Sequence, residues 1–174
     1  ILKPASETPL TAFAIAELLE RAGVPAGVVN VVLPRSTGPM VKEMLDDPRV
    51  RCLSFTGSTE VGRVLLHACA DTVVRASMEL GGNAPFLVLD GADVSAAVEG
   101  AMVAKMRNGG SACTAANRFY VHRDVAEEFT ALLTERMGAL VVGPGDAEGV
   151  ELGPLVSDAE AAKVADLVAG ALAG

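Results

Sequence analysis

The stretch "VRCLSFTGSTEVG", from Val50 to Gly62, combines a strand, a tight turn and the start of a helix. The first six residues form a mainly apolar run that ends at a Gly-Ser turn, which is typical of a buried strand. Gly57 and Ser58 then stand where a helix begins, and Glu60 suits a capping arrangement in its first turn. Free N–H groups and the helix dipole favour phosphate at such a turn. Similar turns occur in every α/β protein, so an ordinary turn remains the alternative.

Strands and helices alternate on both sides of this stretch. The sequence predicts strands at residues 1–5, 28–33, 50–55 and 72–80, and helices at residues 8–23, 38–47 and up to about residue 70. Strands linked by helices indicate a parallel sheet with crossover connections. We therefore predict an α/β fold with a doubly wound parallel sheet, of the Rossmann-like type that binds nucleotides.

A second run of elements begins at "GGNAP", residues Gly81 to Pro85. The sequence predicts strands at residues 86–89 and 118–122, and helices at residues 93–107, 125–137 and near the end of the chain. The 174 residues are enough for one domain or for parts of two. The chain opens as if inside a strand and stops as if inside a helix. We therefore expect an internal fragment of a longer protein.

Composition excludes several classes of protein. Hydrophobic residues make up 51% of the chain, which suits a buried core, and the net charge of −8 argues against nucleic-acid binding. No apolar run has the length of a membrane span, and no signal peptide is evident, so we expect no membrane association. Three widely spaced cysteines indicate a reducing, cytoplasmic compartment. Two histidines without a CxxC or HExxH motif predict no metal site.

Cys113 lies in the stretch "MRNGGSACTAANRFYV", where its flanking residues are small. Small neighbours leave room for a ligand to approach the sulfur, and a thiolate is a strong nucleophile toward carbonyl carbon. The alternative is a packed structural cysteine, which is common. A cysteine–histidine pair with His67 or His122 is a further alternative, although neither histidine has a diagnostic context.

Two more stretches contain polar residues at predicted strand ends. In "MELGGNAP", Glu79 precedes two glycines at the carboxyl end of a strand, where α/β folds bind ligands. A glutamate there can act as a general base on water, or it can be a solvated turn residue. In "LKPASETP", Lys3 ends a predicted strand and Ser6 follows it. Lys3 can hold a ribose or a phosphate, or it can be solvated.

Four stretches taken together are far more specific than any one of them. "KPASETP", "FTGSTEVG", "MELGGNAP" and "NGGSACTAANR", in this order and spacing, resemble the aldehyde dehydrogenase superfamily across essentially the whole chain. Within it, "SFTGSTEVGR", "ELGGNAPF", "AVEGAMVAKMRN" and "CTAANRFYV" look most like bacterial succinate-semialdehyde dehydrogenases. The resemblance implies a partial dinucleotide-binding domain at residues 1–80. It also implies a partial catalytic domain of the aldehyde dehydrogenase fold at residues 81–174, which contains the nucleophile.

The resemblance also implies a reaction. Cys113 matches the nucleophile that attacks the aldehyde to form a thiohemiacetal, and loss of hydride to NAD(P) leaves a thioester. Glu79 matches the glutamate that activates water to hydrolyse the thioester. Arg107, six positions before the cysteine, matches an arginine that binds the far carboxylate of succinate semialdehyde, for which its planar fork is suited. The alternative for Arg107 is a cation that interacts with the C-terminal dipole of its helix.

For the cofactor, the resemblance assigns a run of residues from Lys3 to Ser6 to the adenosine ribose. These residues are Lys3, Pro4, Ala5 and Ser6. Gly57 and Ser58 match the pyrophosphate contact, and Leu80 matches a residue beside the nicotinamide. NAD-preferring relatives commonly have a glutamate at the place of Ser6, and that glutamate repels a 2′-phosphate. We therefore expect NADP to be accepted and preferred over NAD, provided that Glu7 points away.

The sequence departs from the family pattern at two places in the cysteine loop. Ser111 stands where many relatives have glutamine, so hydrogen bonding in the loop is expected to differ. Ala115 stands where some relatives have a second cysteine, so we expect no disulfide switch. The resemblance further implies a homo-oligomer, a dimer or tetramer, for the full-length protein.

Parts of the family's site have no counterpart in these residues. An asparagine motif that stabilises the oxyanion lies upstream in the family, and a glutamate that holds the nicotinamide ribose lies downstream. The alternative function is therefore a catalytically inactive piece that at most binds nucleotide. A cysteine-dependent hydrolase or acyl-transfer domain is a third possibility.

Overall fold

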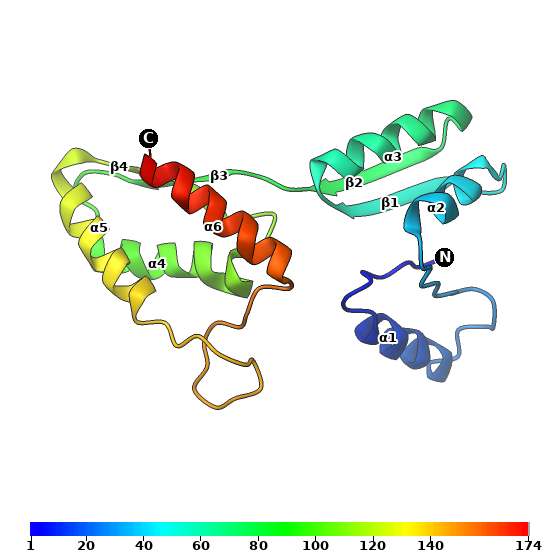
Figure 1. Cartoon of the computed structure of the whole chain (residues 1–174), viewed down its shortest axis with the longest axis horizontal. Helices are drawn as coiled ribbons and strands as arrows, with labels where there is room; N and C mark the ends of the chain where they lie inside the picture. The colour runs from blue at the N-terminus through cyan, green and yellow to red at the C-terminus, as the bar shows by residue number, and fades with distance from the viewer. Residues whose placement is uncertain (174) are drawn as a thin grey trace. The chain divides into compact units, whose positions relative to one another are not determined.

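The computed structural model describes residues 1–173, which form six α-helices and four strands (Figure 1). The helices are α1 (Leu10–Arg21), α2 (Thr37–Asp46), α3 (Thr59–Thr72), α4 (Val94–Met106), α5 (Arg123–Gly138) and α6 (Asp158–Ala173). The strands are β1 (Cys52–Gly57), β2 (Arg75–Leu80), β3 (Ala84–Val88) and β4 (Ala116–Val121). A 3₁₀ turn, η1 (Arg107–Gly110), follows α4.

Two strand–helix–strand repeats follow one another along the chain, β1–α3–β2 and β3–α4–β4. Strands β1 and β2 are hydrogen-bonded in one two-stranded sheet, and β3 and β4 form another. Strands β3 and β4 are parallel, in a register that pairs Phe86 with Phe119 and Val88 with Val121. The predicted α/β class with parallel strands is confirmed. In the described residues the strands form two small sheets rather than one continuous sheet.

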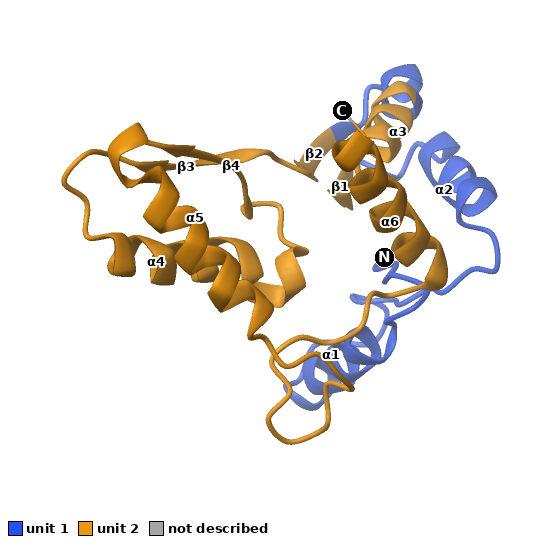
Figure 2. Ribbon diagram, turned by 60° about the vertical axis from the view of Figure 1, so that its left-hand side comes forward, with its two compact units in different colours: residues 1–51, 68–75 blue, residues 52–67, 76–174 orange. Residues whose placement is uncertain are grey.

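The chain divides into two compact units, which are coloured separately in Figure 2. Unit 1 comprises residues 1–51 and 68–75, and unit 2 comprises residues 52–67 and 76–174. These units do not coincide with the two domains expected from the sequence, because residues 52–67 and 76–80, which lie within the expected first domain, belong to unit 2. The functional division at residues 1–80 and 81–174 remains a prediction.

Unit 1 has little regular sheet. The strands predicted at residues 1–5 and 28–33 are wrong as extended strands, because only one parallel bridge forms, between Leu2 and Val31. Two short segments that pair only with each other are at best marginally stable. The helix predicted to begin with a Thr8 cap begins instead at Leu10, with Pro9 at the N-cap and no capping side chain.

The hydrophobic core of unit 2 lies between the β3–β4 sheet and two helices, α4 and α5. Its buried side chains are Val88, Val94, Val98, Ala101 and Phe129. Phe119 packs its ring against both Phe86 and Phe129, with centroids 5.5 and 6.2 Å apart. Helix α4 begins at a capped N-terminus, where the Asp93 carboxylate accepts a hydrogen bond from the Ala96 amide at 3.0 Å. This core fixes the end of α4 and the start of β4, which the cysteine loop connects.

Candidate active site

The loop that contains Cys113 begins with a sharp turn at the end of α4. Three consecutive residues, Asn108, Gly109 and Gly110, adopt left-handed backbone conformations with φ of 55°, 64° and 77°. Glycine and asparagine are the residues that tolerate this region most readily. The Asn108 side chain also donates to the Ser111 carbonyl at 3.0 Å. The "RNGG" sequence therefore ends the helix and redirects the chain just before the cysteine.

Cys113 is exposed, as is Cys52, whereas Cys69 is buried. None of these three cysteines forms a disulfide in the described residues. The loop is anchored just after Cys113, because Ala115 and Ala116 are each only 3% exposed. The Ala115 amide donates to the Ala112 carbonyl at 3.0 Å and closes a tight turn around the cysteine. The thiol is thus carried on a short loop that is fixed at both ends and open to solvent.

The turn that follows Glu79 lies against the same loop. Strand β2 alternates its side chains, so that Met78 and Leu80 are half-buried while Glu79 is exposed. Three residues later, Gly82 approaches the backbone of Cys113 so closely that a Cβ on it would lie 2.8 Å from the Cys113 carbonyl oxygen. The structure therefore brings the turn that follows Glu79 to the cysteine loop, and the catalytic roles of Glu79 and Cys113 remain predictions.

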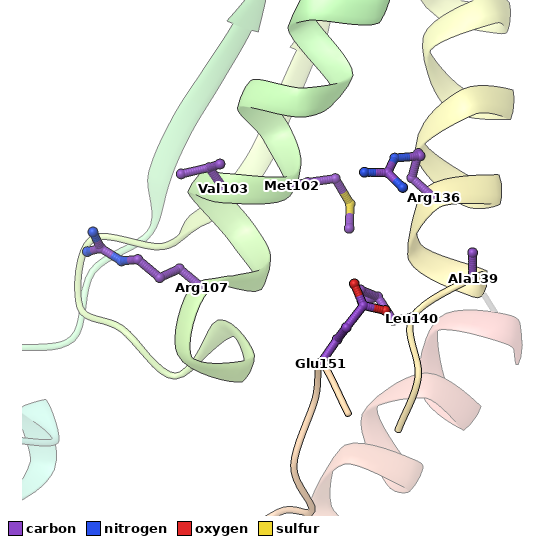
Figure 3. Close-up of a pocket in the computed structure, with 7 residues that line it drawn as sticks. All are labelled: Met102, Val103, Arg107, Arg136, Ala139, Leu140 and Glu151. Carbon is purple, nitrogen blue, oxygen red and sulfur yellow. The ribbon is translucent and has the colours of Figure 1, made fainter. Parts of the chain in front are cut away.

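Arg107 also borders the cysteine loop. A small hollow of about 140 Å³ is lined by Arg107 together with Ala112 and Thr114, the two neighbours of Cys113 in the chain. Arg107 also borders a larger hollow of about 430 Å³ beside α4 and α5. Figure 3 shows its guanidinium on the opposite side of α4 from Arg136, Leu140 and Glu151, which also line that larger hollow. Arg107 is exposed, and its expected role in binding the substrate remains a prediction.

The polar groups of the larger hollow have other partners. The Glu151 carboxylate accepts a hydrogen bond from the Val141 amide at 3.1 Å. Arg136 forms an ion pair with Glu99, with 3.0 Å between Nε and Oε1. Sequence reasoning did not single out these residues, and no motif in the chain marks them. Because their charges are already engaged, the larger hollow offers less binding chemistry than the cysteine loop.

The predicted pyrophosphate contact lies at the start of α3. Gly57 and Ser58 are exposed, and the Ser58 hydroxyl accepts a hydrogen bond from the Val61 amide at 3.3 Å, which makes Ser58 the cap of the helix. The backbone of Glu60 and its contact with Ser58 lower the pKa of the Glu60 carboxyl. Exposed N–H groups and a hydroxyl at the N-terminus of a helix of this length form a donor set that fits a phosphate.

Leu80 packs against the first half of α3. A Cβ on the buried Gly62 would lie 2.8 Å from Leu80 Cδ2, so the Leu80 side chain would have to shift to admit a larger residue at position 62. Leu80 is therefore held where β2 ends, next to the helix that carries Ser58. The expected place of Leu80 beside the nicotinamide remains a prediction.

The predicted ribose-binding residues Lys3 to Ser6 belong to unit 1, whereas Gly57, Ser58 and Leu80 belong to unit 2. Lys3 and Pro4 are half-buried, and Ala5 and Ser6 are exposed. The Lys3 ammonium donates to the Pro4 carbonyl oxygen.

Other functional features concern metals, histidine and membranes. Residues 1–173 contain no cluster of three or more acidic, histidine or cysteine side chains that suits a metal ion. His122 is used as a helix cap, because its Nδ1 accepts from the Asp124 amide at 3.4 Å at the start of α5. None of the described helices is long and apolar enough to cross a membrane.

Comparison with known proteins places these features in context. The model of the aldehyde dehydrogenase family matches residues 1–174. The chain is 51% identical over 172 residues to the succinate-semialdehyde dehydrogenase (NADP(+)) GabD of Escherichia coli strain K12, a match that covers 99% of this chain and 36% of that protein. It is 49% identical to the glutarate-semialdehyde dehydrogenase of Pseudomonas aeruginosa, with 99% of this chain and 35% of that protein covered.

A solved structure gives the same result for the fold. The crystal structure of an E. coli NADP-dependent enzyme superposes with a TM-score of 0.94 at 51% identity, over 98% of this chain and 35% of that one. The chain thus spans about a third of the length of the relatives that it matches.

Proposed function

Because the chain belongs to the aldehyde dehydrogenase family, we propose that the protein oxidises an aldehyde to an acid with NAD(P), using Cys113 as nucleophile and Glu79 as general base. The observation that carries the proposal is the approach of Gly82, three residues after Glu79, to the carbonyl of Cys113. This approach brings together the two segments that carry the groups such a reaction needs, the exposed thiol of Cys113 and the exposed carboxylate of Glu79.

The residues divide the reaction into two steps. In the first, Cys113 Sγ attacks the aldehyde carbon, so that an S–C bond forms and the carbonyl oxygen becomes an alkoxide. Backbone N–H groups near Cys113 stabilise this oxyanion. NAD(P), when bound, supplies the acceptor for the hydride that leaves the same carbon, and a thioester remains on Cys113. In the second step water attacks the thioester carbon, Glu79 takes a proton from the water, and the S–C bond breaks to release the acid.

Replacing each of the two exposed cysteines in turn provides the decisive test. We expect Cys113→Ala to abolish aldehyde-dependent reduction of the cofactor while cofactor binding is kept. Cys52→Ala removes another exposed thiol, outside the proposed site, and serves as the matched control. Full dehydrogenase activity in the Cys113→Ala protein would overturn the proposed mechanism.

For the substrate we propose succinate semialdehyde, with Arg107 as the group that binds its carboxylate. Support comes from the exposed position of Arg107 beside the cysteine loop. The names of the two relatives also point to aldehydes that end in a carboxylate. Arg107→Leu should raise KM for succinate semialdehyde far more than KM for butanal, which has no charge. Equal increases for both aldehydes would remove Arg107 from the substrate site.

For the cofactor we propose a preference for NADP over NAD. The uncharged, exposed Ser6 lies three residues after Lys3, and the E. coli relative is named for NADP(+). A higher kcat/KM with NAD than with NADP would contradict this preference. We propose in addition a homo-oligomer and a cytoplasmic location, the latter because the three cysteines are widely spaced and odd in number.

As a second candidate function we propose a catalytically inactive piece that at most binds nucleotide, because the chain spans about a third of the length of the relatives that it matches. The intact mass of the purified protein separates the two cases. A mass near 17.8 kDa favours the inactive alternative, and a much larger mass makes oxidation of succinate semialdehyde the decisive assay.

A further inference from the structure

Lys105 and Asn117 form a polar bridge across the base of the cysteine loop. Lys105 lies in the last turn of α4, and its ammonium donates to Asn117 Oδ1 at 2.6 Å. Asn117 lies in β4, four residues after Cys113, and its Nδ2 donates to the Gly82 carbonyl at 3.2 Å. The bridge therefore connects the helix before the loop, the strand after it and the turn that follows Glu79.

The directions of the two hydrogen bonds explain why position 105 is a lysine and position 117 an asparagine. An ammonium can only donate, so Lys105 turns the oxygen of the Asn117 amide toward itself and leaves the NH₂ group for the Gly82 carbonyl. A charged donor also makes a stronger hydrogen bond than a neutral one. An aspartate at position 117 keeps the partner for Lys105 but has no donor for Gly82.

Further contacts hold the same turn and the same loop. Arg118 Nε donates to the Asn83 carbonyl at 2.9 Å, so two consecutive carbonyls of the turn are bound by β4 side chains. The Lys105 side chain also runs along Gly110, where a Cβ would lie 3.6 Å from its Cε and Nζ atoms. Lys105 thus contacts the loop three residues before Cys113 as well as four residues after it.

We propose that Lys105 and Asn117 are positioning residues, which fix Glu79 relative to Cys113 by holding the turn that follows Glu79 against the cysteine loop. This inference rests on the proposed function. Hydride loss needs the thiol and the cofactor, whereas hydrolysis needs Glu79 at a set distance from the acyl carbon. Loosening the turn should therefore slow thioester hydrolysis more than formation of the thioester. A displacement of about 1 Å in such a group can cost about a hundredfold in rate.

The test compares three variants by stopped-flow formation of NADPH from succinate semialdehyde. Asn117→Asp keeps an acceptor for Lys105 but replaces the donor to the Gly82 carbonyl with a charged oxygen, and Lys105→Met removes the charge that orients the amide. Arg123→Met is the matched control, because this exposed cation on α5 has no hydrogen bond or ion pair within residues 1–173. For the first two variants we expect a rapid burst near one NADPH per Cys113, followed by a steady rate reduced about tenfold or more. The ratio kcat/KM for the aldehyde should change much less, because KM falls together with kcat when hydrolysis limits turnover.

Equal reduction of burst and steady rates, or no change in either, would overturn the positioning role. A second measurement does not depend on activity. Amide hydrogen exchange of residues 79–83 should become faster in Asn117→Asp than in Arg123→Met. If the unmodified protein forms no NADPH, the proposed function fails. In that case the positioning role is tested by hydrogen exchange alone, and it is overturned if residues 79–83 exchange equally fast in Asn117→Asp and in Arg123→Met.

Discussion

Two regions of this chain contain α-helices with apolar side chains, yet the two regions differ in how much of this apolar surface they bury. The region β3–α4–β4–α5 has a shared core in which Val88 and Phe129 are 2% exposed and Ala101 is fully buried. Residues 1–51 bury a single hydrophobic side chain, Leu45 of α2, and α1 buries none. Helix periodicity is therefore enough to form a helix here, but a core forms only where a parallel strand pair lies beside two helices. The cysteine loop is attached to the region with the core.

The largest expected effect comes from removing a ring in each region. Phe129→Ala should lower the free energy of unfolding by about 3–5 kcal/mol, because a buried ring is replaced by a cavity between α4 and the sheet. Phe13→Ala in α1 removes a ring that is 43% exposed and should cost about 1 kcal/mol or less. Urea unfolding of both variants measures the difference. Equal losses would show that residues 1–51 contain a core comparable to that of the other region.

A pair of adjacent glycines tests how tightly the Glu79 turn meets the cysteine loop. Gly82→Ala should cost about 1–3 kcal/mol, because the new Cβ would lie 2.8 Å from the Cys113 carbonyl oxygen and backbone must move. Gly81→Ala is the matched control, since a Cβ there would meet no atom within 4 Å. Thermal or urea unfolding gives both values. A Gly82→Ala protein as stable as Gly81→Ala would mean that the two segments are not in contact.

The sequence predicted more of the region with the core than of the other one. The alternation in residues 84–138 was confirmed as β3, α4, β4 and α5 because each predicted strand has a neighbour and a helix to pack on. The strands predicted at residues 1–5 and 28–33 have the same apolar composition but only one bridge between them. Composition indicates which residues can be buried, whereas burial also requires a partner surface.

The candidate site shows the same limit. Motif matching singled out Cys113, Glu79 and Arg107, which have recognisable spacing in the chain. It did not single out Lys105 and Asn117, although both lie inside the quoted motifs. Their connection to Gly82 spans 35 residues and depends on the parallel pairing of β3 with β4. Only the folded register shows that these polar residues meet.

Helix capping provides a smaller test of the comparison. Asp93→Ala should cost about 1 kcal/mol, because it removes the carboxylate that accepts from the Ala96 amide at the start of α4. Ser36→Ala at the start of α2 should change the stability very little, since Ser36 makes no capping hydrogen bond. Urea unfolding of the two variants is again the measurement. A larger loss of stability for Ser36→Ala than for Asp93→Ala would mean that Ser36, and not Asp93, caps its helix.

The smallest expected effect concerns pH in residues 1–51. Arg49 donates from Nε and Nη2 to the Asp47 carboxylate and lowers the pKa of that carboxyl to about 2. Because the folded pKa lies below the unfolded value of about 3.9, this pair stabilises the fold above that value and ceases to do so as pH falls toward 2. Arg49→Ala should raise the pKa of Asp47 in an NMR titration, and 1 M salt should reduce the difference by screening an exposed pair. An unchanged pKa would mean that the two side chains do not meet in solution. Residues 1–51 would then keep the Lys42–Asp46 ion pair but lose the pair of Arg49 with Asp47. The loss would widen the contrast with the region that carries Cys113.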